Sequence, residues 1–145
     1  MKKMLVNLAL LLVVSSAFAM PPVSEQVMKQ FSALFPTVQD ARWFDNDTHY
    51  DVYFDKDEVK HHIRYDRNGK IISTRNYYPG SKLCSFIKAK TTEKYPTKSI
   101  YGVTEITSND EMYYVVVLED EDSWTNVQID ATGQMKVLDK MKKAK

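Results

Sequence analysis

One pattern that occurs twice constrains the fold of this chain more than any other feature of its sequence. An amphipathic stretch ends at Phe35-Pro36, and a second one ends at Tyr95-Pro96, 60 residues further along the chain. The turn sequence at 65–69, which ends in Gly69, returns 64 residues later at 129–133, which ends in Gly133. Two copies are too few for a solenoid and indicate a duplicated module.

Each copy has the pattern of one helix followed by four antiparallel strands. Helices are predicted at about 24–35 and 82–95, because apolar residues recur there at helical spacing and Pro36 and Pro96 cannot continue a helix. The strand-like runs that follow are separated by polar turns too short for a crossover helix. They are expected near 41–45, 48–55, 58–66 and 70–76, and near 99–107, 111–119, 123–130 and 134–139. The predicted fold class is α+β, a tandem duplication of an α-β-β-β-β unit.

Smaller features refine this outline. Ser24 and Ser81 are the expected N-caps of the two helices. The second copy has four more residues than the first, and a longer first strand or a bulge around 102–109 would absorb them. The glycines are all explained by turns, a linker or a bulge, which leaves none for a phosphate-binding loop. Phe31 and Phe54 are expected in the core, on the sheet face that the helices cover.

The first 19 residues have the pattern of an export signal. A positively charged start precedes an apolar run at 5–14, and Ala17-Phe18-Ala19 forms a small-x-small cleavage site. Cleavage would leave a single domain over 20–145, with repeats at about 24–78 and 81–139. No later apolar run reaches the ~20 residues that span a bilayer, so no membrane span is expected after cleavage. A periplasmic location is predicted, and secretion stays open.

Charge and cysteine content narrow the class of partner. Of the 20 basic residues, two leave with the signal, so 18 remain against 19 acidic residues. This balance argues against a nucleic acid as partner. The lysine cluster at 140–145 is expected to form a solvated, frayed tail. Cys84 is the only cysteine, so no internal disulfide is predicted. The residue directly after the cleavage site is Met20 rather than a cysteine that could carry a lipid anchor.

The order of these motifs resembles the PepSY-like family of exported, Bacteroides-type bacterial proteins, also described as β-lactamase-inhibitor-like. The resemblance rests on the Phe35-Pro36 helix end followed by Ala41-Arg42-Trp43, the strand at 50–54, the turn at 65–69, and second-copy counterparts at 95–96, 114–117 and 129–133. It implies two helices packed on one face of a continuous, curved antiparallel sheet. It also implies an open sheet face like the one with which the β-lactamase inhibitor protein (BLIP) clasps an enzyme. The family supplies no catalytic residues.

The three histidines are expected to be structural or surface residues. A two-residue turn at Lys56-Asp57 would pair Asp51 with His62 across a hairpin. His61 then lies on the core face, and His62 lies on the opposite face, toward Asp51 and Arg64. Adjacent histidines on a strand point to opposite faces and do not readily chelate one ion. No metal site is therefore predicted at His49, His61 or His62.

Nucleophilic and cofactor chemistry is not expected. Cys84 is predicted on the first turn of the second helix between Leu83 and Phe86, where cysteine behaves as a small hydrophobe. A helix N-terminus can lower a thiol pKa, but no histidine is expected beside it. Serine-hydrolase, zinc and paired-cysteine motifs are absent from the sequence. The sequence therefore predicts a protein that is not an enzyme and has no cofactor.

An acidic hairpin turn is the candidate cation site. Glu119, Asp120, Glu121 and Asp122 place four like charges in one tight turn, and these repel unless a cation or a lysine lies close. Carboxylates suit calcium, but no stretch of the chain matches the twelve-residue calcium loop. A solvated turn is the expected structure, and calcium binding stays as the alternative.

The sheet face opposite the helices carries the predicted partner-binding site. The same hairpin register, with a turn at Asp120-Glu121, pairs Val117 with Trp124 on that face. A sheet face in water should be polar, yet the second copy places a run of apolar side chains there. Tyrosine and tryptophan are enriched in interface hot spots. The predicted site consists of Tyr113, Val115, Val117 and Trp124, extended from the first copy by Tyr53.

Two functions follow from these observations. The first is that of a non-enzymatic periplasmic binding module, which uses its open sheet face to bind a protein partner. Inhibition of an enzyme is a more specific version of this function. A homodimer through the same face is an alternative occupant. The second function is a periplasmic protein that responds to a small ligand or to calcium through its acidic turns or the concavity of the sheet.

Overall fold

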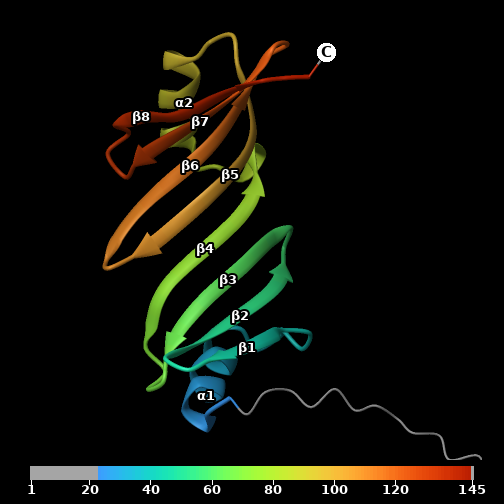
Figure 1. Ribbon diagram of the computed structural model, residues 1–145, viewed down its shortest axis with the longest axis vertical. Coiled ribbons are helices and arrows are strands. Elements are labelled where there is room, and N and C mark those ends of the chain that lie inside the picture. The colour runs from blue at the N-terminus through green and yellow to red at the C-terminus, as the bar shows by residue number, and fades with distance from the viewer. Residues whose placement is uncertain (1–22, 145) are drawn as a thin grey trace, which may run out of the picture.

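The computed structural model describes residues 23–144, in which a helix followed by four strands occurs twice (Figure 1). The predicted export signal at 1–19 lies outside the described residues. The first half consists of α1 (Glu25–Leu34), β1 (Arg42–Asn46), β2 (His49–Lys56), β3 (Val59–Asp66) and β4 (Ile71–Pro79). The second half consists of the short 3₁₀ helix η1 (Gly80–Lys82), α2 (Ser85–Lys94), β5 (Ser99–Ser108), β6 (Glu111–Glu119), β7 (Ser123–Asp130) and β8 (Met135–Lys142). No helix among these residues is long and apolar enough to cross a membrane.

The eight strands of the described residues form one antiparallel sheet, in which each strand pairs with its neighbour in the chain from β1 to β8. The sheet is open and curved, and α1 and α2 lie toward its opposite ends (Figure 1). β4 and β5 pair at the centre of the sheet and join the two halves. The fold class is therefore α+β, as the sequence predicts.

The helix starts follow the sequence signals in the first half but not in the second. Ser24 is the N-cap of α1, and its side chain accepts a hydrogen bond from the backbone N–H of Val27 at 3.4 Å. The predicted N-cap Ser81 is wrong, because η1 occupies that position. The chain then extends through Leu83, which is buried, so α2 begins only after Cys84.

Both helices pack on the same face of the sheet, and each closes its own core. Residues that pair across neighbouring strands lie on the same face, so this face can be followed from β2 to β6. The pairs are Val52–Ile63, Ile63–Thr74, Thr74–Thr107 and, further along β5, Val103–Val116. The first core consists of Val27, Phe31, Trp43, Tyr50, Val52, Phe54, Ile63 and Tyr65. The second core consists of Leu83, Ile87, Val103, Tyr114, Val116, Leu118, Val127 and Ile129. The opposite face of the sheet carries neither helix and is called the open face below.

The predicted register of the β2–β3 hairpin is wrong by two residues. The turn is Asp57-Glu58, with φ of 51° and 61°, and Asp51 pairs with Arg64 rather than with His62. A two-residue turn with positive φ at both central positions favours Asp at the first of them, which places Asp57 there. Side chains alternate along a strand with period two, so this displacement leaves every residue on its predicted face.

The β6–β7 hairpin is displaced in the same way. Val117 pairs with Asn126, and Trp124 pairs with Glu119 rather than with Val117. Asp120 itself closes this turn, because its backbone N–H donates to the carbonyl of Ser123 at 3.1 Å. The predicted pairs are therefore wrong, but the predicted faces of Val117 and Trp124 are confirmed.

The strand lengths explain how the second half accommodates its extra residues. β5 has ten residues where β1 has five, which confirms the predicted longer first strand. A bulge also occurs, but it lies between Ile100 and Gly102, just before the predicted range of 102–109. β4 continues to Pro79, past its predicted end, because it pairs with β5 as far as that residue. β8 continues to Lys142, so the predicted frayed tail is wrong for Lys140 and Lys142, which pair with β7.

Truncation of a core phenylalanine should destabilise the protein strongly. Phe31 is 3% exposed and meets Trp43 and Phe54 edge-on, with ring centroids 5.1 and 5.3 Å apart. Phe31→Ala should lower the free energy of unfolding, measured by urea denaturation, by about 3 to 5 kcal/mol, because it leaves a cavity in the first core. Leu34→Ala, on the same helix at 55% exposure, is the control and should cost less than about 1 kcal/mol. A loss below ~1 kcal/mol for Phe31→Ala would contradict the face assignment.

Candidate functional site

The four predicted binding residues of the second half lie together on the open face. Tyr113, Val115 and Val117 alternate along β6, and Trp124 lies near the start of β7. Neighbours on the sheet leave all four half-buried. The structure adds Ile106 and the more exposed Tyr77 and Tyr101 to this surface. The seven residues that form the surface are called the apolar patch below: Tyr77, Tyr101, Ile106, Tyr113, Val115, Val117 and Trp124.

Contacts on two sides hold Trp124 within this patch. Tyr101 meets the indole edge-on, with ring centroids 4.7 Å apart and an interplanar angle of 74°. The ammonium group of Lys143 lies over the indole ring, 4.5 Å from its centroid. Neither contact belongs to the two cores. The indole is therefore held in place by contacts that lie outside the two cores.

Tyr53 lies on the open face of β2, but an interruption separates it from the apolar patch. Its ring stacks on His62, with centroids 4.1 Å apart and planes 11° apart. Along the row of cross-strand partners, His62 and then Arg75 lie between Tyr53 and Ile106. The apolar surface is not continuous there, because two charged or titratable side chains cross it.

A buried carboxylate organises the open face of the first half. Asp51 is 6% exposed. His62 Nε2 lies 2.8 Å from Asp51 Oδ1, and Arg64 Nε donates to the same oxygen at 2.9 Å. Asn46 Nδ2 donates to Oδ2 at 3.0 Å, and His49 Nε2 lies 3.2 Å from that oxygen. These five residues are called the Asp51 cluster below.

Sequence reasoning identified only part of this cluster. It placed His62 and Arg64 on the same face as Asp51, which the structure confirms. It did not connect His49 or Asn46 with Asp51. The alternation of β2 puts His49 and Asp51 on one face, two residues apart, and this signal could have been used. Asn46 reaches Asp51 only because the β1–β2 turn folds it back, which no local pattern indicates.

The contacts of Asp51 determine its charge state. Burial disfavours the charged carboxylate, but hydrogen bonds from Arg64 and His62 outweigh burial and hold the pKa of Asp51 below its ordinary value of 3.8. A carboxyl group whose pKa is lower in the folded than in the unfolded state stabilises the fold above the unfolded value. This stabilisation is lost as the pH falls through the folded-state pKa. The cluster is therefore a charged structural element of the open face at neutral pH.

Removal of the Asp51 charge should destabilise the protein at neutral pH. Asp51→Asn keeps the shape of the side chain and should lower the free energy of unfolding by about 2 kcal/mol at pH 7, because charged hydrogen bonds are lost. The difference from the wild type should shrink below about pH 4, where the wild-type carboxylate begins to take up its proton. Asp55→Asn, exposed on the same strand and face, is the control and should be nearly neutral. Urea denaturation at several pH values measures this, and a difference that does not depend on pH would contradict it.

Lysines neutralise part of the acidic turn between β6 and β7. Asp120 pairs with Lys98, and Glu119 pairs with Lys143 at 3.2 Å. Hydrogen bonds from Lys98 and Ser123 hold the pKa of Asp120 well below its usual range. Lys143 also contacts Trp124, so the prediction of a solvated tail is wrong for this residue. The protein's own lysines therefore relieve part of the repulsion expected in this turn.

Calcium should therefore leave the stability of the protein unchanged. In residues 23–144, no group of three or more acidic, histidine or cysteine side chains is placed to hold a metal ion. This applies to the candidate residues Glu119, Asp120, Glu121 and Asp122. Thermal melts with calcium up to about ten times the ~1 mM Kd of the weakest calcium modules should show no shift in Tm, since only an ion that binds the folded state raises it. Magnesium at the same concentration controls for ionic strength, and a rise with calcium alone would support the calcium-responsive alternative.

A chain of polar side chains crosses the helix-covered face between the two cores. His61 Nδ1 lies 2.9 Å from Asn76 Oδ1, and Asn76 Nδ2 donates to Glu105 Oε1 at 3.1 Å. The Tyr78 hydroxyl donates to Glu105 Oε2 at 3.0 Å, and burial together with the charge of Glu105 raises the pKa of Tyr78. His61 also stacks on Phe54, with centroids 4.6 Å apart, which confirms its predicted face. The chain links β3, β4 and β5.

Cys84 lies in an exposed position, and the prediction that it packs as a small hydrophobe is wrong. It is the N-cap residue of α2 rather than part of the first turn. The preceding Leu83 takes the buried position instead. The Sγ atom of Cys84 lies 4.0 Å from the hydroxyl of Tyr114.

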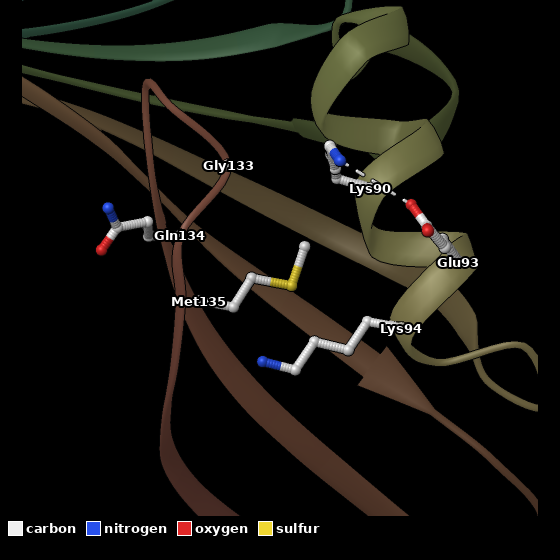
Figure 2. Close-up of a pocket in the computed structure, with 6 residues that line it drawn as sticks. All are labelled: Lys90, Glu93, Lys94, Gly133, Gln134 and Met135. Atoms are coloured by element: carbon white, nitrogen blue, oxygen red, sulfur yellow. Dashed lines mark ion pairs between the residues drawn. The ribbon is translucent and has the colours of Figure 1, made fainter.

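Two hollows lie at corresponding places, where the last turn of each half meets its helix. Figure 2 shows the hollow of the second half, with an ion pair of 3.8 Å between Lys90 and Glu93. Gln30, Tyr65 and Gly69 are among the residues that line the hollow of the first half. The residues around the second hollow are Lys90, Glu93, Lys94, Gly133, Gln134 and Met135. Because the same contact between a helix and a turn occurs in both halves, at Gly69 and at Gly133, the hollows are features of helix packing.

A further hollow, of about 450 Å³, lies beside the apolar patch. Its lining includes Lys60, Tyr77, Tyr101, Gly102, Thr104 and Val117. Most of these residues belong to β3, β4 and β5 and point to the open face. The hollow therefore lies on the surface that the sequence predicts for partner contact, and it is called the Gly102 hollow below.

Known structures resemble this fold. No protein-family model and no curated protein matches the chain. A BLIP-like protein from Bacteroides fragilis is 16% identical, with a TM-score of 0.62 over 86% of this chain and 89% of that chain. A DUF2874 family protein from Bacteroides ovatus is 15% identical, with a TM-score of 0.61 over 84% and 87%. A protein of Bacteroides eggerthii provisionally described as periplasmic is 9% identical, with a TM-score of 0.60 over 83% and 88%.

These similarities define the class of fold. The chain has a BLIP-like fold, an open, curved, eight-stranded antiparallel sheet with two helices, which is the architecture that the sequence resemblance implies. At such low identity the similarity concerns the architecture alone, because one fold hosts many functions. The PepSY part of the resemblance stays a prediction.

Proposed function

We propose that this protein is a non-enzymatic periplasmic binding module that contacts a partner protein through its open face. The contact residues are Tyr113, Val115, Val117 and Trp124, with Tyr53 beside the Asp51 cluster as a separate contact. A more specific version of the proposal is that the partner is an enzyme and that binding inhibits it. Its support is the BLIP-like fold that the chain shares with the protein from Bacteroides fragilis.

A comparison of the two halves carries this proposal. Corresponding residues of the hairpins β2–β3 and β6–β7 lie 64 positions apart. On the helix-covered face the corresponding residues are apolar in both halves: Tyr50 and Tyr114, Val52 and Val116, Phe54 and Leu118. On the open face, His49, Asp51 and Lys60 correspond to Tyr113, Val115 and Trp124. The fold accepts polar residues at these positions, so it does not require the apolar ones, and apolar surface of this kind is typical of an interaction site.

The chemistry of the open face also supports binding rather than catalysis. Asp51, the most buried acid of this face, is already bonded to His62 and Arg64. Glu119 is paired with Lys143. Groups that satisfy one another in this way stabilise a fixed surface, whereas a catalytic acid or base must present its proton site to a substrate.

Trp124→Ala should separate binding from stability. The variant should lose no more than about 1 kcal/mol of stability, because Trp124 lies outside both cores. Its Kd for the partner should rise by about thirtyfold, which corresponds to ~2 kcal/mol, if Trp124 is a hot spot. Affinity capture from a periplasmic extract identifies the partner, and calorimetry with the purified partner measures the Kd. If the partner is an enzyme, its activity is measured with and without this protein.

Gln128→Ala is the matched control for this experiment. Gln128 lies on the same strand and the same face as Trp124 and is also half-buried, but its side chain is polar. The control should leave the Kd unchanged. An unfolded Trp124→Ala monomer would show that Trp124 belongs to the core, and an unchanged Kd would remove it from the contact surface. Sedimentation equilibrium of the wild type tests whether the partner is a second copy.

A further inference from the structure

Gly102 is a strand residue that the fold does not require to be glycine. Its φ is not positive, whereas the turn residues Gly69 and Gly133 both have φ of 87°. A Cβ atom built on Gly102 meets nothing within 4 Å, whereas one on Gly80 would come within 2.5 Å of Ile100. The prediction that a bulge explains this glycine is wrong for Gly102, because only bulges with positive φ demand a glycine.

The first half shows what the fold accepts at this place. Gly102 pairs with Val117, and the residue that pairs with the corresponding Tyr53 is Arg42, which is large and exposed. A glycine inside a strand costs about 0.5 to 1 kcal/mol relative to alanine. Such a glycine often marks a place where a ligand or another chain approaches the backbone closely. Gly102 forms part of the lining of the Gly102 hollow, which gives such an approach a defined location.

Exposed aromatic side chains border this hollow. Tyr77 is 41% exposed and Tyr101 is 63% exposed. Tyr101 also contacts Trp124, so the hollow is continuous with the contact surface of the proposed function. Aromatic side chains around a pocket favour the binding of a further apolar side chain, because they supply large contact area with little loss of conformational freedom.

The uncompensated charge at this hollow is positive. Lys60 is exposed and forms no ion pair or side-chain hydrogen bond within residues 23–144, although Asp55 is its cross-strand partner. The acidic residue of the lining, Glu58, is paired with Lys82 at 3.4 Å. Arg75, which is exposed on the same face of β4, is likewise without an ion pair among the described residues. A complementary partner therefore presents negative charge here.

We infer that the Gly102 hollow receives one large apolar side chain of a partner protein, and that a carboxylate adjacent to that side chain pairs with Lys60. This inference rests on the proposed function and specifies its partner: a segment in which an aromatic or large aliphatic residue lies next to Asp or Glu. The absence of a side chain at Gly102 leaves room in the hollow, Tyr77 and Tyr101 border it, and Lys60 favours a partner with a negative charge.

Random peptides displayed on phage provide the probe for this inference. Panning on the full mature protein should enrich sequences in which a large apolar residue lies next to Asp or Glu. Gly102→Leu should raise the Kd of the synthesised peptides by at least about tenfold, since a side chain then fills the hollow. Lys60→Glu should raise the Kd by a comparable factor, because it reverses the charge beside the hollow. Arg42→Leu, at the corresponding place in the first half, is the matched control and should change the Kd by less than about twofold.

Thermal melts should show that Gly102→Leu is folded, because its new side chain points into open space. If it does not fold, Tyr101→Ser replaces it, since Tyr101 is largely exposed. Peptides without acidic residues, or equal binding to Gly102→Leu, would overturn the inference. A wild-type dimer that Gly102→Leu dissociates would also overturn it, because the occupant would then be a second copy.

The same peptides separate this inference from the proposed function. If Trp124→Ala weakens the binding of these peptides and Gly102→Leu does not, the open face is the contact surface but the hollow does not receive a side chain of the partner. If neither substitution weakens peptide binding, both the proposed function and the inference are wrong.

Discussion

The pairing of β4 with β5 is the interaction on which the rest of this structure depends. The two cores share no buried residue, and each is closed by its own helix. The cross-strand pairs from Ser73–Ser108 to Pro79–Gly102 join them into one sheet. On the helix-covered face, Glu105 supports this junction because it accepts hydrogen bonds from both Asn76 and Tyr78. Without this pairing each half would expose an unpaired edge, and the continuous open face would not exist.

The sequence predicts the element order and the face of each residue far better than it predicts which residues pair. Alternation with period two places Val52 and Val116 on the helix-covered face and Val117 on the open face, and the structure confirms this. A hairpin displaced by two residues has the same alternation, so the pattern cannot distinguish it from the correct one. Only the turn geometry at Asp57-Glu58 makes that distinction, and it depends on φ angles that composition specifies weakly.

Contacts between distant segments were the other part that the sequence could not provide. Lys143 reaches Glu119 and Trp124 because β8 lies beside β7, whereas a run of terminal lysines by itself indicates only a solvated tail. Asn46 reaches Asp51 through the fold of β1 onto β2. In the candidate site, the faces of the predicted residues were therefore available from the sequence. The Gly102 hollow was not, because it forms where β3, β4, β5 and β6 meet.

The two edges of the sheet have features that disfavour association with another strand. β1 has only five residues. β8 carries Lys136, Lys140 and Lys142, and its register with β7 shifts next to Leu138. Short strands, lysines and bulges at an edge disfavour the addition of another strand. A partner on the open face would instead meet side chains, because the backbone groups of the inner strands pair with the neighbouring strands. Its affinity would then come from side chains and from the hollow between them. The binding proposed for the open face would therefore depend on single side chains, whereas the two cores, on the other face, stabilise the fold.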